Sequence, residues 1–152
     1  MILASACLAG EKCRYNGEHR MHPVIAELGK RGKIAAVCPE VMGGLSIPRL
    51  ACEIEGADAQ SVLDSKARVL NMAGGDITEA VLRGCYKALD AAKKNNIKLA
   101  VLKDKSVCCA VDTLYDGSFQ SRLVKGKGIL ALLLEHNGIR VVNSEELLAW
   151  PI

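Results

Sequence analysis

Residues 78–109 read TEAVLRGCYKALDAAKKNNIKLAVLKDKSVCC and contain the clearest helix of the chain, followed by a buried strand. Val81, Cys85 and Leu89 recur every four residues, which is the spacing of one helical face. The lysines that follow suit the negative end of a helix dipole. Residues 99–103 are a short, mostly apolar run, as in strands buried on both faces. A helix that leads into a buried strand is typical of an α/β fold.

The same alternation extends through the rest of the chain. Similar apolar runs predict three more buried strands, at residues 1–5, 33–37 and 139–142. Helices are expected at residues 23–28, at 129–136, and from Ser144 to just before Pro151. Two alternating segments, 50–54 and 66–72, predict a small strand pair.

These elements predict an α/β fold built as a single three-layer domain over residues 1–152. Strands that alternate with helices form a mostly parallel sheet with helices on both faces, in a Rossmann-like arrangement. The small strand pair is an insertion into this arrangement. No shift of composition marks a second domain.

The composition excludes several classes of protein. The 152 residues are 50% apolar, carry a net charge of +3 and are enough for a buried core, which excludes a disordered chain. One Trp, three Tyr and one Phe are few aromatic residues, so direct nucleic-acid binding is not expected. No apolar run approaches the roughly 20 residues of a membrane span, and no basic leader precedes the first strand. We therefore expect a cytoplasmic protein that does not enter the membrane.

Seven cysteines are present, and three groups of them follow predicted strands. Cys7 comes two residues after the first strand, Cys38 directly after the second, and Cys108 and Cys109 shortly after the third. The carboxyl ends of parallel strands meet at one edge of a sheet, so these thiols are expected to converge. Three converging thiolates suit zinc with an open fourth position, or an iron–sulfur cluster with one iron free of protein ligands.

The other cysteines have different expected roles. Cys52 alternates with apolar neighbours and Cys85 lies on the apolar face of its helix, so both are predicted in the core. Cys13 lies deeper in the first loop, and we expect it to be either a further ligand or a thiol that stabilises the loop. An odd cysteine count in a chain of this size favours metal binding or thiol chemistry over a disulfide framework.

Several polar residues belong to the same loops. Glu40 follows Cys38 by two residues and is either a general base for water or a solvated loop carboxylate. Ser106 either orients water or a substrate carbonyl, or bonds to nearby backbone in a turn. Arg14, Arg49 and Lys103 are candidates for holding an anionic or carbonyl group, with plain solvated loop charges as the alternative.

These residues resemble the DUF523 family, which includes the thiouracil desulfidases. The likeness runs nearly from end to end, in order and in length. It rests on five motifs: SACLAG at residues 5–10, CRYNG at 13–17, CPEVMGGL at 38–45 with Pro48 and Arg49, LK at 102–103 with Ser106 and Cys109, and YDGSF at 115–119.

The resemblance implies a [4Fe-4S] cluster held by Cys7, Cys38 and Cys109, with one iron free to take sulfur from a thiolated pyrimidine such as 2-thiouracil. It implies that Glu40 activates water, that Ser106 assists, and that sulfur passes to the open iron without electron transfer.

The third loop departs from the family pattern. Residues 106–110 read SVCCA where Ser-Pro-Ser-Cys-Gly is usual, so Cys109 matches by register while Cys108 replaces a serine and is a competing ligand. Two other functions stay open. One is a non-catalytic module that stores or senses metal or sulfur, and the other is a thiolated-tRNA de-modifying protein that needs an RNA-binding partner.

Overall fold

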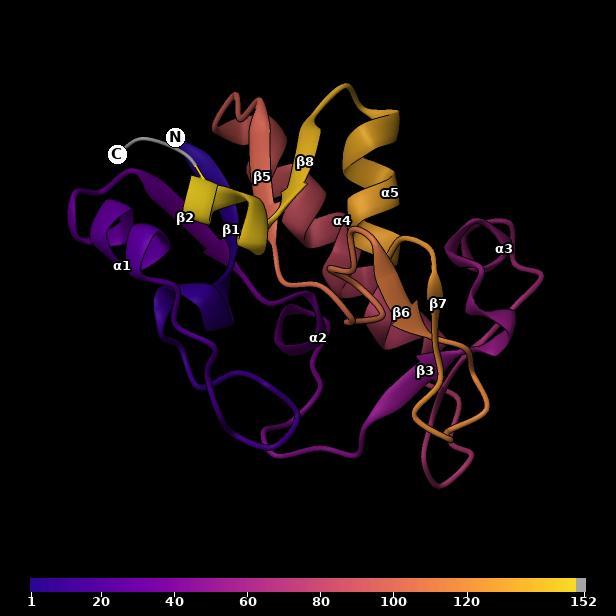
Figure 1. The fold of residues 1–152 in the computed structure, drawn as a ribbon. Coiled ribbons are helices and arrows are strands. Elements are labelled where there is room, and N and C mark those ends of the chain that lie inside the picture. The colour runs from indigo at the N-terminus through magenta and orange to yellow at the C-terminus, as the bar shows by residue number, and fades with distance from the viewer. Residues whose placement is uncertain (150–152) are drawn as a thin grey trace.

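The computed structural model describes residues 1–149 and is built around a four-stranded parallel sheet (Figure 1). Its strand order is β2-β1-β5-β8. Leu3 of β1 lies opposite Ala35 on one side and Ala100 on the other, and Val101 of β5 lies opposite Val142. The strands are β1 (Ile2–Ser5), β2 (Ile34–Val37), β5 (Leu99–Leu102) and β8 (Arg140–Asn143). The predicted parallel α/β fold is confirmed.

Helices cover both faces of this sheet (Figure 1). One face packs on α4 (Thr78–Lys94) and α5 (Ile129–His136), which lie side by side. The other face packs on α1 (Pro23–Lys30), on the 3-10 helix η1 (Ala6–Ala9) and on Leu147 of η3 (Ser144–Ala149). Successive strand residues point to opposite faces, so Leu3 belongs to the first core and Ala4 to the second.

Local sequence explains where the main helices begin. Pro23 occupies the first turn of α1, and Nδ1 of His22 accepts a hydrogen bond from the amide of Val24 at 3.2 Å. The Asp76 carboxylate accepts hydrogen bonds from the amide and hydroxyl of Thr78, where α4 begins. The predicted helix after Ser144 is the 3-10 helix η3, and its expected limit before Pro151 lies outside the described residues, as do residues 150–152 of the expected domain.

Two small antiparallel pairs stand beside the sheet. The first pairs β3 (Cys52–Ile54) with β4 (Val69–Asn71) and confirms the predicted strand pair. The second pairs β6 (Thr113–Tyr115) with β7 (Leu123–Lys125), in a segment where the sequence predicts no strand. Its strands have three residues each and β7 is exposed throughout, so no apolar alternation marks it. The remaining short helices are α2 (Pro39–Met42), η2 (Glu55–Ala57) and α3 (Ala59–Leu63).

A pair of glycines seats α2 directly on α4. A Cβ atom on Gly43 would collide with the carbonyl oxygen of Ala80, and one on Gly84 would collide with that of Pro39. Only glycine permits this approach of two backbones. The contact fixes the position of Cys38, which precedes α2, and of Glu40 within it.

No helix within residues 1–149 has the length and apolar character needed to cross a bilayer.

Candidate functional site

A cavity of about 350 Å³ opens at the carboxyl ends of β1, β2 and β5. Its volume lies within the range of about 300–1,000 Å³ that is usual for small-molecule sites. Cys7, Cys38 and Cys109 all line it, each from the loop that follows a different strand. The structure thus brings together the three thiols whose convergence was predicted from their positions after the strands.

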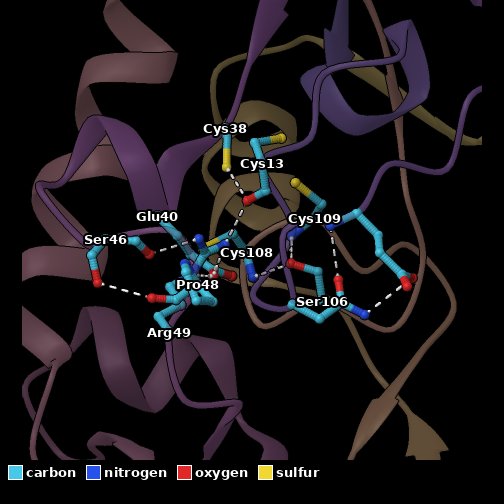
Figure 2. Close-up of polar contacts among 11 residues, drawn as sticks. Cys13, Cys38, Glu40, Ser46, Pro48, Arg49, Ser106, Cys108 and Cys109 are labelled. Carbon is cyan, nitrogen blue, oxygen red and sulfur yellow. Dashed lines mark hydrogen bonds and ion pairs between the residues drawn. The ribbon is translucent and has the colours of Figure 1, made fainter.

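Cys109 and its neighbour Cys108 face opposite ways. The Ser106 hydroxyl accepts hydrogen bonds from the amides of Cys108 and Cys109 at 3.1 and 3.2 Å, which closes a tight turn (Figure 2). Cys109 then borders the cavity, whereas Cys108 is buried against Cys85 of α4 and does not border it. Of the two thiols left open by the sequence, only Cys109 is available to a group in the cavity. Ser106 also lines the cavity, and its bonds to the two amides are those expected of a hydroxyl that stabilises a turn.

The environment of Cys109 includes Ser5, to which sequence reasoning assigned no role. Burial raises the pKa of Cys109 well above its ordinary value, and a hydrogen bond from the Ser5 hydroxyl acts in the opposite direction. The Ser5 oxygen also accepts a hydrogen bond from the amide of Lys103 at 3.0 Å. Ser5 therefore joins the end of β1 to the loop after β5.

Cys13 lies beside Cys38 and also lines the cavity. The Cys38 thiol donates to the carbonyl oxygen of Cys13 at 3.7 Å (Figure 2). A hydrogen bond from the Cys13 thiol lowers the pKa of Cys38 to about 7, in spite of burial, and the same bond raises the pKa of Cys13. Cys13 is thus a free thiol next to a candidate ligand.

The prediction of a core position is confirmed for Cys85, which is fully buried in α4, and is incomplete for Cys52. Cys52 packs against the main core but also lines the cavity, because β3 runs along its wall. Burial raises the pKa of this thiol.

Glu40 forms an ion pair with Arg49. Nε and Nη2 of Arg49 each lie 2.6 Å from Oε2 of Glu40, and the side chains are only 9% (Arg49) and 14% (Glu40) exposed (Figure 2). Arg49 also donates to the carbonyl oxygens of Cys13 at 2.9 Å and Ser46 at 3.2 Å. Glu40 and Arg49 are therefore not solvated loop charges, which was the alternative considered for both from sequence. In the described part of the chain Oε1 of Glu40 accepts no hydrogen bond, which leaves it for water or a substrate.

Arg14 and Lys103 line the same cavity as cations without an ion pair in residues 1–149. Nη1 of Arg14 is buried and has no hydrogen-bond partner, and the guanidinium carbon lies 5.8 Å from the centre of the Tyr15 ring. Burial and the charge of Arg14 lower the pKa of Lys103. A buried donor without a partner is a place where a water molecule or a bound ion can supply the acceptor.

Aromatic side chains gather at the cavity although the chain has few. Tyr15, Tyr115 and Phe119 all line it, and these are three of the five aromatic residues in the sequence. The buried carboxylate of Glu53 holds the loop of Phe119 by accepting hydrogen bonds from the amides of Gly117 at 2.9 Å and Phe119 at 3.2 Å. Sequence reasoning placed the three aromatic residues in motifs of the family resemblance but gave none of them a role in the site. Their position in loops, in a chain with few aromatic residues, was the sequence signal that could have indicated a role in binding.

The donor atoms fit an iron–sulfur cluster. Cys7, Cys38 and Cys109 could supply three sulfur ligands from three loops that line one cavity, and thiolates are the usual ligands of such clusters. In residues 1–149 no three His, Cys, Asp or Glu side chains are grouped around a position for a single metal ion.

Comparisons with known proteins agree with this assignment. The family model described as 2-thiouracil desulfurase matches residues 2–146. An uncharacterized protein of Bacillus subtilis (strain 168), YbbK, is 39% identical over 147 residues, covering 97% of each chain. The solved structure of the [4Fe-4S]-dependent thiouracil desulfidase TudS superposes with a TM-score of 0.85 at 33% identity, over 96% of this chain and 91% of that one. The resemblance stated from the sequence motifs is confirmed, and the chain belongs to the 2-thiouracil desulfurase family.

Proposed function

We propose that this protein is a [4Fe-4S]-dependent desulfidase that replaces the sulfur of a thiolated pyrimidine by oxygen. The reaction is a hydrolysis. Water adds its oxygen to the ring carbon, the C–S bond breaks, and sulfur leaves with the electron pair and is released as hydrosulfide with a proton. No oxidant or reductant is consumed. The proposed substrate class is 2-thiouracil and related thiolated bases.

One observation carries the proposal. Three thiols and one carboxylate, from loops that follow three different strands, border the same cavity in a chain of this family. Cys7, Cys38 and Cys109 would hold the cluster, and Cys108 is turned into the core. When bound, the cluster supplies an iron without a protein ligand that accepts the sulfur of the substrate as a Lewis acid.

The residues of the chain supply the rest of the chemistry. Glu40 takes a proton from water at Oε1 while Oε2 stays paired with Arg49, so that the carboxylate is held in one position. Ser106 fixes the turn that presents Cys109 and is a positioning residue through its backbone contacts. Phe119 and Tyr115 offer flat apolar surfaces that suit a planar heterocycle.

The test is anaerobic reconstitution with iron and sulfide, followed by metal and sulfide counts and a sulfide-release assay on 2-thiouracil and 4-thiouracil. We expect close to four irons per chain and release of sulfide. Cys109→Ser should lose both, whereas Cys108→Ser should keep both, because only Cys109 borders the cavity. A full cluster without sulfide release from either base would favour the storage or sensing module instead.

A further inference from the structure

After the proposed catalytic groups are assigned, two partly buried cations of the cavity are left over, Arg14 and Lys103, whereas a third, Lys105, is exposed. Arg49 is neutralised by Glu40, but Arg14 and Lys103 form no ion pair within residues 1–149. Nζ of Lys103 donates to the carbonyl oxygen of Asp104 at 3.3 Å. The Asp104 carboxylate itself accepts hydrogen bonds from three backbone amides and the Thr113 hydroxyl. It is therefore committed to shaping its own loop.

Arg14, Lys103 and Cys7 line the same cavity. The positive charge of each cation lowers the pKa of the Cys7 thiol against the effect of burial, and the charge of Arg14 adds to burial in lowering the pKa of Lys103. Two like charges are held together in a partly desolvated place at a cost. Nη1 of Arg14 adds a second cost, because it is buried without an acceptor. Both costs are offset when an anion in the cavity binds the two cations.

We propose that Arg14 and Lys103 form a binding site for a sulfur anion, as the sulfur-handling part of the desulfidase site. This inference rests on the proposed function. The ligand chemistry is a singly charged sulfur: either the thiolate of a deprotonated thiopyrimidine or the hydrosulfide that leaves after water has attacked. The cavity suits this ligand, because Cys7 also lines it and sulfur must arrive and depart beside the thiols proposed to hold the cluster. A guanidinium and an ammonium group supply charge-assisted hydrogen bonds for it.

The experiment measures binding to the reconstituted protein under anaerobic conditions, by the change in absorption and electron paramagnetic resonance of the cluster. The ligands are hydrosulfide, 2-thiouracil, uracil and inorganic phosphate. The variants are Arg14→Gln, Arg14→Lys and Lys103→Gln. The matched control is Lys98→Gln, because Lys98 is an exposed lysine that precedes β5 while Lys103 follows it.

We expect Arg14→Gln and Lys103→Gln each to weaken sulfur-anion binding by about tenfold or more, with a smaller loss in Arg14→Lys and none in Lys98→Gln. Uracil binding should stay unchanged. A loss confined to hydrosulfide identifies the product as the bound anion, and a loss confined to 2-thiouracil identifies the deprotonated substrate.

The inference is overturned if both charge-removing variants bind hydrosulfide and 2-thiouracil like the wild type, or if uracil or phosphate binding falls by the same factor. Urea unfolding of each variant separates loss of binding from loss of structure, and Lys103→Gln provides a second test if Arg14→Gln does not fold. If the wild type takes up no iron, the proposed function fails. The anion site is then tested by calorimetry of hydrosulfide on the iron-free protein, where equal affinity of the wild type and both variants overturns it.

Discussion

Replacing Glu40 by Gln tests whether its carboxylate acts in chemistry, in structure or in both. The substitution keeps the shape of the side chain and removes its charge, which lies 2.6 Å from two nitrogens of Arg49 in a place where both side chains are mostly buried. Two unit charges about 4 Å apart attract by roughly 4 kcal/mol at an effective dielectric constant of about 20. Arg49 retains its bonds to the carbonyls of Cys13 and Ser46, which offset part of this loss. We expect Glu40→Gln to lower the free energy of unfolding by about 2–3 kcal/mol.

The rate of sulfide release by Glu40→Gln should fall much further than its loss of folding stability can account for. Loss of a general base costs about 10²–10⁴-fold in rate. Arg49→Gln breaks the same ion pair and also loses the bonds to the Cys13 and Ser46 carbonyls, so it should lose more stability than Glu40→Gln. It keeps the carboxylate, however, and therefore a larger share of the sulfide release. Urea unfolding gives the free energies, and initial rates of sulfide release from 2-thiouracil at a temperature where both variants are folded give the activities.

The double variant Glu40→Gln/Arg49→Gln completes the comparison. Its loss of stability should be smaller than the sum of the two single losses, because each single variant already removes the pair. Its activity should resemble that of Glu40→Gln. The reasoning is refuted if Glu40→Gln releases sulfide at the rate of the wild type, or if Arg49→Gln loses as much activity as Glu40→Gln at a temperature where both variants are folded.

Three further substitutions test other parts of the structure. Gly84→Ala places a methyl group against the Pro39 carbonyl and should lower the free energy of unfolding in urea by about 2–3 kcal/mol. Gly29→Ala in α1, where the added methyl group meets open space, should be neutral or slightly stabilising. Equal effects of the two substitutions would contradict the contact between α2 and α4. Burial acts to raise the pKa of Asp104, but the hydrogen bonds to its carboxylate outweigh burial and lower the pKa. The stability that this carboxylate contributes is therefore present above about pH 4, and it is lost as the pH falls through the pKa of Asp104 in the folded protein. Asp104→Asn should therefore be less stable by about 1–2 kcal/mol at pH 7 and approach the wild type in acid, and parallel unfolding curves at all pH values would disprove this. Phe119→Leu should raise KM for 2-thiouracil about fivefold with kcat unchanged, and a fall in kcat at constant KM would show that Phe119 does not bind the ring.

The sheet and the meeting of its loops could be predicted from sequence because buried parallel strands are continuous apolar runs. The predicted strands at residues 1–5 and 99–103 differ from β1 and β5 by one residue at an end. Cys7, Cys38 and Cys109 follow such strands, so their convergence follows from the topology alone.

The conformation of the loops could not be predicted in the same way, because contacts between distant residues determine it. The segment that forms β6 is organised by the Asp104 carboxylate, and the loop of Phe119 is held by Glu53, which is 66 residues earlier in the chain. The opposite orientations of Cys108 and Cys109 depend on a turn that Ser106 closes and on the position of α4. No local pattern in the sequence encodes these contacts.

The seating of α2 on α4 has a consequence for the dynamics of the site. A helix of four residues has almost no stability of its own, so α2 persists because Gly43 and Gly84 let it rest on the longest helix of the core. The amides of Met42 and Gly43, which bond within α2, should then exchange with deuterium only as fast as α4 opens. Cys38 and the Glu40 carboxylate are therefore held rigid by the packing of α2 on the core. The site and the fold should unfold together, as one cooperative unit.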